Sequence, residues 1–324
     1  MTSSSLLKNK CRGGLLFMSV SLGTVKRIFI TAKKSESVTV STLETYERGL
    51  VRFIEYLTTD LEVLDIDEVT PATIRDYLIS LQEGGLRTIT IHQHFRILRT
   101  LFLFLYREDY IPKNPMVNVK APKIEQKEMR TFTSQEIMKI LNAFNREDFI
   151  GMRNYCIMCL LFSTGIRKTE LADLTLTDLN INNDLIRIAN GKGQKERFAP
   201  IGRVLRRTLL KYLSIREEYL KGEYCQWVFV TPRDTRKLTT SCMSVLFQKL
   251  KKTLGITGEK VACHTWRHTF AKTYLLNGGD IFSLQKILGH ADITTTKNYL
   301  NLNNQEMKSQ HAKFNPLDNK DWLY

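Results

Sequence analysis

The chain has 324 residues, enough for two domains that each bury a core, and its 43% hydrophobic and 10% aromatic content is typical of a soluble folded protein. Its 48 Lys and Arg residues outnumber its 33 Asp and Glu residues, which gives a formal net charge of +15. This charge favours a polyanionic partner, of which nucleic acid is the commonest in cells.

The cysteine content argues against a secreted, disulfide-bonded protein. The six cysteines are too few and too irregularly spaced for a disulfide framework. Cys156 and Cys159 have the spacing of a metal-binding pair, but they lie in an apolar helical stretch and no second such pair follows. We therefore interpret them as helix core and expect a protein of the reducing cytoplasm that uses neither a metal ion nor a cofactor.

The N-terminal region resembles a targeting segment only loosely. Three basic residues between positions 8 and 12 precede an apolar patch at 15–22, but the patch lacks a small-residue cleavage site and runs into Lys26 and Arg27. No apolar run approaches the ~20 residues that a membrane span requires. We expect no membrane or secretory segment, a flexible basic extension over residues 1–35, and Met18 as an alternative start.

The next segment, residues 36–122, has the pattern of a helical domain. Residues 41–44 have the S-x-x-E form of a capping box, and apolar residues at helical spacing follow it. Thr70 and Pro71 predict the start of a second helix, which ends at Gly84 and Gly85. A third helix is expected over about 90–107, and polar residues 123–131 form the candidate linker.

Residues 132–324 are predicted to form a second domain that is mainly helical. Thr133 to Glu136 forms another capping box. Leu185–Ile188 and Arg197–Ile201 read as two strands joined by the turn residues 191–194, and Trp227–Val230 reads as a further strand. The predicted fold class is mostly α: a helical N-terminal domain and a mixed, mainly helical second domain with a small antiparallel sheet.

Six residues of the second domain form a set suited to breaking a phosphodiester. Such a reaction needs a nucleophile, positively charged donors for the transition state, and an acid for the leaving oxygen. Tyr299 suits the nucleophile, because a phenol bonded to phosphate stores the energy of the broken bond. The candidates, in chain order, are Arg167, Lys192, His264, Arg267, His290 and Tyr299.

The local sequence around these residues supports their roles. Gly289 and His290 read as a helix end and Asp292 as the next N-cap, which would place Tyr299 about two turns into the following helix. His264 and Arg267 lie one helical turn apart. A histidine in this pocket is suited to donating a hydrogen bond to a phosphate oxygen or to accepting the tyrosine proton.

The arginines and the lysine have separate expected tasks. The guanidinium groups of Arg167 and Arg267 match pairs of phosphate oxygens, and Glu170 is expected to orient Arg167. Lys192 is expected at a hairpin tip, from which it would protonate the leaving 5′ oxygen. Lys195 is close enough in sequence to compete for that role.

The ordered pattern Arg, Lys, His-x-x-Arg, His, Tyr resembles the catalytic domain of the tyrosine recombinases, which include phage integrases and Xer-type recombinases. The resemblance covers Phe132 to Leu300, and residues 36–122 resemble the core-binding domain of the family more loosely. It implies two domains that clamp double-stranded DNA, a 3′-phosphotyrosyl intermediate, a free 5′-hydroxyl and strand exchange in a homotetramer. It also implies that Asn303 to Phe314 packs onto a neighbouring protomer.

Some features depart from the family pattern. Trp266 stands where many members have an aliphatic residue, and Asn301 stands where many have His, but neither change removes a catalytic group. The region before Ser35 is too short for an arm-binding domain, which favours a recombinase that acts at a simple core site. The DNA target, a partner recombinase or directionality factor, and the choice between mobile-element integration or excision and resolution of DNA multimers stay open.

Two other functions compete with this interpretation. A type IB topoisomerase uses the same chemistry only to relax supercoils, but the small helical first domain and the hairpin at residues 191–193 favour a recombinase. A non-catalytic DNA-binding protein would keep the basic surface and lose at least one catalytic position, whereas all six are present.

Overall fold

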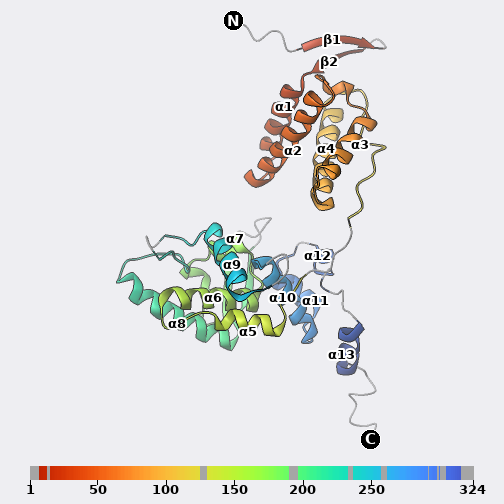
Figure 1. The fold of residues 1–324 in the computed structure, drawn as a ribbon. Helices are drawn as coiled ribbons and strands as arrows, with labels where there is room; N and C mark the ends of the chain where they lie inside the picture. Colours follow the sequence, from red (N-terminus) through yellow and green to blue (C-terminus); the bar gives the residue numbers. More distant parts are fainter. Residues whose placement is uncertain are drawn as a thin grey trace. The chain divides into compact units, whose positions relative to one another are not determined.

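The protein folds into two compact units, Met1–Gln126 and Lys127–Tyr324 (Figure 1). The computed structural model describes residues 7–12, 15–124, 130–189, 196–232, 236–256, 261–290, 292–297, 299 and 304–314. Helices dominate both units and the sheets are small and antiparallel, so the predicted fold class is confirmed. No helix in these ranges has the length and apolar character needed to cross a bilayer.

The first unit is an antiparallel two-stranded ribbon followed by helices. Its elements are β1 (Leu7–Arg12), β2 (Leu15–Val20), α1 (Leu22–Ser35), α2 (Val40–Thr59), the short 3-10 helix η1 (Ile66–Glu68), α3 (Pro71–Glu83) and α4 (Thr88–Arg107). Their buried apolar faces form one core of leucine, isoleucine and aromatic side chains. The Phe53 and Tyr77 rings meet edge to face in this core, with their centroids 4.9 Å apart.

The prediction of a flexible extension over residues 1–35 is wrong for residues 22–35, which form α1. Leu22, Val25 and Phe29 of this helix are buried, and the Phe29 ring packs edge to face against Tyr46 and Phe104. These apolar residues recur at helical spacing, so burial on one face stabilises the helix. The basic residues among them led to the prediction of a solvent-exposed, flexible segment.

Helix starts in this unit show one wrong and one correct prediction. α2 begins two residues earlier than its expected capping box, because Thr39 is the N-cap and its hydroxyl accepts a hydrogen bond of 3.4 Å from the Thr42 amide. α3 begins as predicted, with Pro71 in its first turn. The hydroxyls of Thr70 and Thr73 each accept a hydrogen bond from the other residue's amide.

The second unit contains the remaining elements. They are α5 (Ser134–Asn142), α6 (Phe149–Thr164), α7 (Lys168–Ala172), the 3-10 helix η2 (Leu176–Asp178), β3 (Leu179–Asn180), β4 (Leu185–Ile188), β5 (Arg197–Pro200), α8 (Arg203–Leu220), α9 (Thr240–Leu254), α10 (Cys263–Leu276), α11 (Ile281–Leu288), α12 (Ile293–Lys297) and α13 (Asn304–Phe314). The strand order is β3-β4-β5, and both pairings are antiparallel.

Several local predictions for this unit are confirmed. The β4–β5 pair is the expected hairpin, with Leu185 opposite Pro200. Thr133 and Glu136 form the predicted capping box at α5. Cys156 is fully buried in α6, as the helix-core interpretation requires, and burial raises the pKa of its thiol well above the usual value.

The predicted strand at Trp227–Val230 is wrong. Trp227 and Val230 each make a single bridge, to Thr175 and Lys237 respectively. The carbonyl oxygens of Cys225 and Trp227 instead accept hydrogen bonds, each 2.7 Å long, from the buried Arg216 guanidinium. An arginine side chain therefore satisfies backbone groups that a strand would have paired with another strand.

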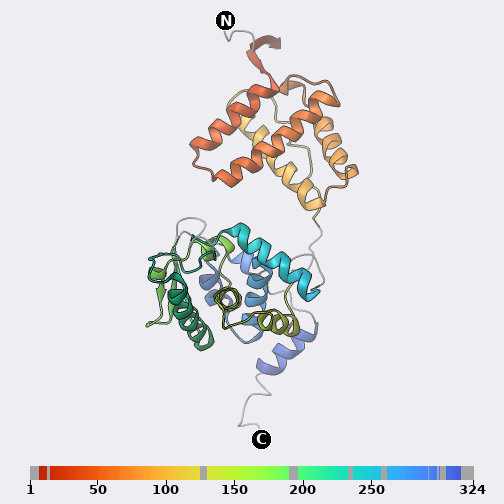
Figure 2. The ribbon, with the colours of Figure 1, turned by 60° about the vertical axis from the view of Figure 1, so that its left-hand side comes forward.

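α6 forms the centre of the second unit and brings other helices to its C-terminal end. It packs against α8 and α10 (Figure 2), and it ends at Gly165 in the left-handed conformation with φ of 58°. A Cβ at Gly165 would lie 2.7 Å from side-chain carbons of Phe270 and Leu288. Glycine therefore lets α6, α10 and α11 converge at one point, immediately before Arg167.

The last described helix, α13, lies against α10 of its own chain. Lys272 Nζ is 2.7 Å from Glu306 Oε1, and Gln310 donates a hydrogen bond of 2.6 Å to the Leu276 carbonyl. The family resemblance instead implied contact of this segment with a neighbouring protomer. The contacts within the chain show where α13 lies in a single protomer.

Candidate active site

A buried carboxylate, Glu170 of α7, organises the arginines. Each of its oxygens accepts a hydrogen bond of 2.7 Å from the Arg197 guanidinium. Arg167 donates two more, 2.7 Å from its side chain and 2.8 Å from its backbone amide. Glu170 is 5% exposed, so an unpaired charge there would be costly, and two arginines compensate it.

The pKa of Glu170 reflects this balance. Burial alone raises the pKa, but the hydrogen bonds and charge of Arg197, followed by the hydrogen bonds from Arg167, outweigh burial and lower it to about 2. Glu170 is therefore ionised at neutral pH and holds both guanidinium groups. The expected orienting contact between Glu170 and Arg167 is present, and the pairing with Arg197 is an addition to it.

Arg167 is held at two points and still reaches the surface. Besides Glu170, it donates a hydrogen bond of 3.2 Å to the Gly289 carbonyl, and its side chain remains 26% exposed. A cavity of about 460 Å³ lies beside it, and Arg267, His264, Lys168 and Ser244 are among the other residues that line it. Arg167 can therefore meet a ligand without leaving its partners.

Arg267 of α10 is almost fully buried. It donates hydrogen bonds of 2.6 Å to the carbonyls of Gly165 and Leu288, and its NH2 lies 2.9 Å from His290 Nε2. Burial, followed by the nearby charge of Arg167, lowers the pKa of Arg267 to about 10, so it remains protonated at neutral pH. These contacts fix the guanidinium before any ligand arrives.

The contacts of His290 define its tautomer. Because Arg267 is a cation and only donates, His290 Nε2 accepts, and Nδ1 carries the proton that it donates to Thr296 Oγ1 at 2.8 Å. Burial and the charges of Arg267, Arg167 and Arg197 lower the pKa of His290 to about 4. His290 is thus neutral at pH 7, and in this state it orients Arg267.

Tyr299 lies beside the two histidines His268 and His290. Its hydroxyl is 3.2 Å from His268 Nδ1, and its ring is nearly parallel to that of His290, at 14° with centroids 6.1 Å apart. Burial raises the pKa of the phenol, while the charge of Arg267 opposes that rise. Asp292 precedes α12 and accepts a hydrogen bond from the Thr294 amide, as the predicted N-cap requires, but α12 ends at Lys297 and Tyr299 lies beyond it with 3-10 helical backbone.

The structure brings together five of the six candidates. Arg167, Arg267 and His264 line one cavity, and His290 and Tyr299 connect to Arg267 through the contacts above. His264 is exposed at the start of α10, and its ring centroid is 6.1 Å from that of His268. Lys192 and Lys195 lie outside the described residues.

Two residues of this network were not identified from the sequence. Arg197 appeared only as the first residue of a strand, and its long-range partners Glu170 and the Ile287 carbonyl depend on the fold. His268 stands next to Arg267 and one helical turn after His264, a spacing that places the two histidines on one face. That spacing was the available indication for His268, whereas the sequence offered none for Arg197.

Comparison with known proteins shows the class to which this fold and site belong. The model of the phage integrase family matches residues 130–306, and the phage integrase SAM-like domain matches residues 27–124. The chain therefore belongs to the phage integrase family of tyrosine recombinases. It is a tyrosine-type site-specific DNA recombinase.

Individual relatives extend over both units. Tyrosine recombinase XerD of Halalkalibacterium halodurans is 32% identical over 285 residues, which cover 88% of this chain and 94% of the relative. Tyrosine recombinase XerC of Thermodesulfovibrio yellowstonii is 31% identical over 284 residues, 86% of this chain and 92% of the relative. The Tn1549 transposon integrase in complex with transposon right end DNA has the same fold, with a TM-score of 0.73 and 20% identity over 91% of this chain and all of that one.

Proposed function

We propose that this recombinase cuts and rejoins duplex DNA through Tyr299. One observation carries the proposal: Tyr299 lies against His290, whose Nε2 is bonded to the buried cation Arg267 at the cavity that Arg167 also lines. Attack of the phenol oxygen on phosphorus would give a 3′-phosphotyrosyl bond and a free 5′-hydroxyl. The covalent bond conserves the energy of the phosphodiester, so religation needs no nucleotide cofactor.

The arginines are suited to stabilising the charge that develops on the phosphate. Arg267 is held by two carbonyls and His290, and Arg167 is held by Glu170 and the Gly289 carbonyl. Donors fixed in this way need no reorganisation when the transition state forms. We assign both arginines to the non-bridging oxygens, His264 to the same phosphate and His290 to the orientation of Arg267.

Lys192 is the proposed acid for the leaving 5′ oxygen. It belongs to the connection between β4 and β5, and β5 begins with Arg197, which binds the same carboxylate as Arg167. A lysine on this connection would therefore approach the leaving group from a strand that is anchored to the site. Lys195, three residues later, is the alternative.

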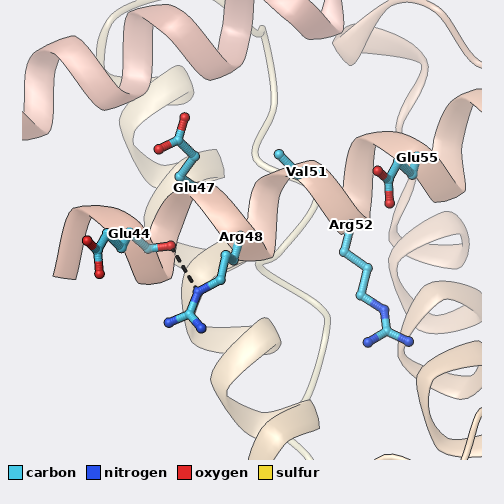
Figure 3. A pocket seen from close by; sticks show the side chains of 6 residues that line it. All are labelled: Glu44, Glu47, Arg48, Val51, Arg52 and Glu55. Atoms are coloured by element: carbon cyan, nitrogen blue, oxygen red, sulfur yellow. Dashed lines mark hydrogen bonds between the residues drawn. The ribbon is translucent and has the colours of Figure 1, made fainter. Parts of the chain in front are cut away.

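Double-stranded DNA containing a recombination site is the proposed substrate. The Tn1549 integrase was solved in complex with transposon right end DNA, and XerH was solved bound to its difH substrate, which supports a DNA substrate here. In the first unit, Arg48 and Arg52 of α2 extend from the same side of the helix (Figure 3) and line a surface depression together with glutamates. We assign these arginines to backbone phosphates, so binding should weaken as salt rises.

Site-specific recombination joins two DNA duplexes, so we propose that the protein acts as a homotetramer on DNA. We place it in the cytoplasm. A partner recombinase or a directionality factor is a further candidate partner. The relatives include both Xer recombinases and a transposon integrase. Accordingly, the reaction would serve either integration and excision of a mobile element or resolution of DNA multimers. The recovered DNA site distinguishes these two roles.

Covalent trapping tests the proposal. Protein mixed with fragmented host and element DNA is denatured, and the protein-linked fragments are sequenced beside a Tyr299→Phe control. We expect adducts at one or a few sites with the wild-type protein and none with the variant. Equal adduct formation by Tyr299→Phe would remove Tyr299 as the nucleophile.

A further inference from the structure

His268 is titratable and contacts the proposed nucleophile, yet none of the roles assigned above uses it. Its Nδ1 lies 3.2 Å from the Tyr299 hydroxyl, and the two ring centroids are 5.5 Å apart. A donor and an acceptor at this distance form a hydrogen bond in which the phenol donates when Nδ1 is unprotonated. This contact depends on the fold, because the two residues are separated by 31 positions.

The surroundings of His268 keep its ring neutral. Burial, followed by the neighbouring His264 and Arg267 on α10, lowers its pKa to about 4. Among the described residues, Tyr299 and His290 also lie near it, and both are neutral at pH 7. A neutral imidazole has one nitrogen free to accept a proton, and in the tautomer protonated at Nε2 that nitrogen is Nδ1, beside the phenol.

We propose that His268 is the general base that takes the Tyr299 proton during DNA cleavage. As the phenol oxygen forms its bond to phosphorus, its proton passes to His268 Nδ1. The bond from phosphorus to the 5′ oxygen breaks with its electron pair on that oxygen, which takes a proton from Lys192. Religation reverses each transfer. This inference rests on the function proposed above and adds a catalytic residue to it.

The other two histidines are placed for different tasks. Both nitrogens of His290 are engaged, Nε2 by Arg267 and Nδ1 by Thr296. His264 lines the cavity with Arg167 and Arg267, which suits a donor to the phosphate. His268 is the histidine whose nitrogen meets the Tyr299 hydroxyl.

Arrival of the substrate strengthens the base. A phosphodiester carries one negative charge, and an anion near an imidazole favours its protonated form and raises its pKa. The phenol also becomes more acidic as its oxygen bonds to phosphorus, so proton transfer need not precede attack. The neutral resting state of His268 is therefore compatible with its task.

The test is single-turnover cleavage of a nicked duplex that carries the site recovered by trapping with the wild-type protein. His268→Asn keeps an acceptor oxygen near the position of Nδ1 but accepts no proton, so it separates positioning from base catalysis. His268→Gln is a second variant in case the first fails to fold, and Arg206→Ala, whose partner Asp184 is exposed, is the control outside the site. Melting temperature and DNA affinity are measured for every variant.

Each variant is assayed across pH on a normal duplex and on one with a bridging 5′-phosphorothiolate, whose sulfur leaves without protonation. We expect His268→Asn to cleave about 10²-fold more slowly at pH 7, a typical contribution of a general base. Its rate should rise about tenfold per pH unit as the phenol ionises by itself. The phosphorothiolate should restore the cleavage rate of Lys192→Ala but not that of His268→Asn, while Arg206→Ala keeps the wild-type pH profile.

The inference is overturned if both His268 variants keep the wild-type pH profile, or if the phosphorothiolate restores their rates. If neither variant folds, the wild-type protein is assayed on the phosphorothiolate alone. Its cleavage rate must fall at low pH as a single base is protonated. A cleavage rate that does not change with pH overturns the assignment. Failure of the proposed function is distinct from either result, because the wild-type protein would then give no Tyr299-dependent adduct.

Discussion

The carboxylate of Glu170 and the guanidinium of Arg197 form a buried pair with two hydrogen bonds, each 2.7 Å long. Arg197 is the first residue of β5, and Glu170 belongs to α7, which Arg167 precedes directly. The pair therefore ties the strand that follows the Lys192 segment to the helix that positions Arg167. Arg167, which lines the cavity, and the β4–β5 hairpin share one buried anchor.

Breaking this pair should destabilise the second unit. Arg197→Met leaves Glu170 with Arg167 alone, and loss of one partner of a buried ion pair typically costs about 3–5 kcal/mol. Arg206→Ala is the matched control, because its pair with Asp184 is largely exposed and should contribute less than about 1 kcal/mol. Urea unfolding monitored by circular dichroism measures both, and equal stability of the two variants would contradict the anchoring role.

Removing Arg167 should slow cleavage more than it weakens binding. Arg167→Ala removes a fixed donor from the developing charge, a loss typically worth about 10²–10³ in rate. Single-turnover cleavage and DNA affinity are measured together, with Arg206→Ala as the control outside the site. A cleavage rate within threefold of the wild type would exclude Arg167 from the reaction.

The histidines and Glu170 give the stability of the second unit a defined pH dependence. The pKa of His290 falls from 6.5 to about 4 on folding, so the unfolded chain binds more protons between these values and stability is lost as pH falls through that window. The pKa of Glu170 falls from 4.5 to about 2, so its contribution is present above pH 4.5 and is lost as pH falls toward 2.

Chemical denaturation at a series of pH values separates the two contributions. His268 titrates over the same window, so His290→Gln should reduce the loss of stability between pH 6.5 and 4 by about half and keep the loss below pH 4. An unchanged slope in the upper window would show that His290 titrates alike in the folded and unfolded chain.

Gly165 should tolerate a methyl group poorly. Gly165→Ala combines the cost of a left-handed alanine with contacts at 2.7 Å to Phe270 and Leu288, and we expect a loss of about 2–4 kcal/mol. Gly255→Ala is a matched control, since Gly255 also ends a helix with φ of 60° but no heavy atom lies within 4 Å of its Cβ position. Thermal unfolding compares the variants, and equal losses would show that only backbone strain matters.

Local sequence patterns predicted much of the fold. The Thr133 and Thr70 caps and the β4–β5 hairpin depend on neighbouring residues, and the structure contains them. Predictions from local sequence patterns were wrong where residues distant in the sequence determine the backbone structure. Arg216 satisfies the carbonyls that a strand at 227–230 would have paired, and packing against Phe104 makes residues 22–35 a helix.

The same distinction applies to the candidate site. The order of Arg167, Arg267 and Tyr299 along the chain indicated a phosphodiester chemistry, and these residues converge in the structure. The contacts of Arg197 with Glu170 and of His268 with Tyr299 bridge 27 and 31 positions. Such contacts are products of the tertiary fold, so no local spacing encodes them.

Identification of the residue bonded to DNA tests the central claim most directly. A wild-type adduct is digested with nuclease and protease, and tandem mass spectrometry locates the remaining nucleotide. We predict a 3′-phosphate ester on the peptide that contains Tyr299 and no adduct from Tyr299→Phe. A nucleotide on another residue, such as the nearby Tyr274, or an undiminished adduct from Tyr299→Phe, would contradict the account.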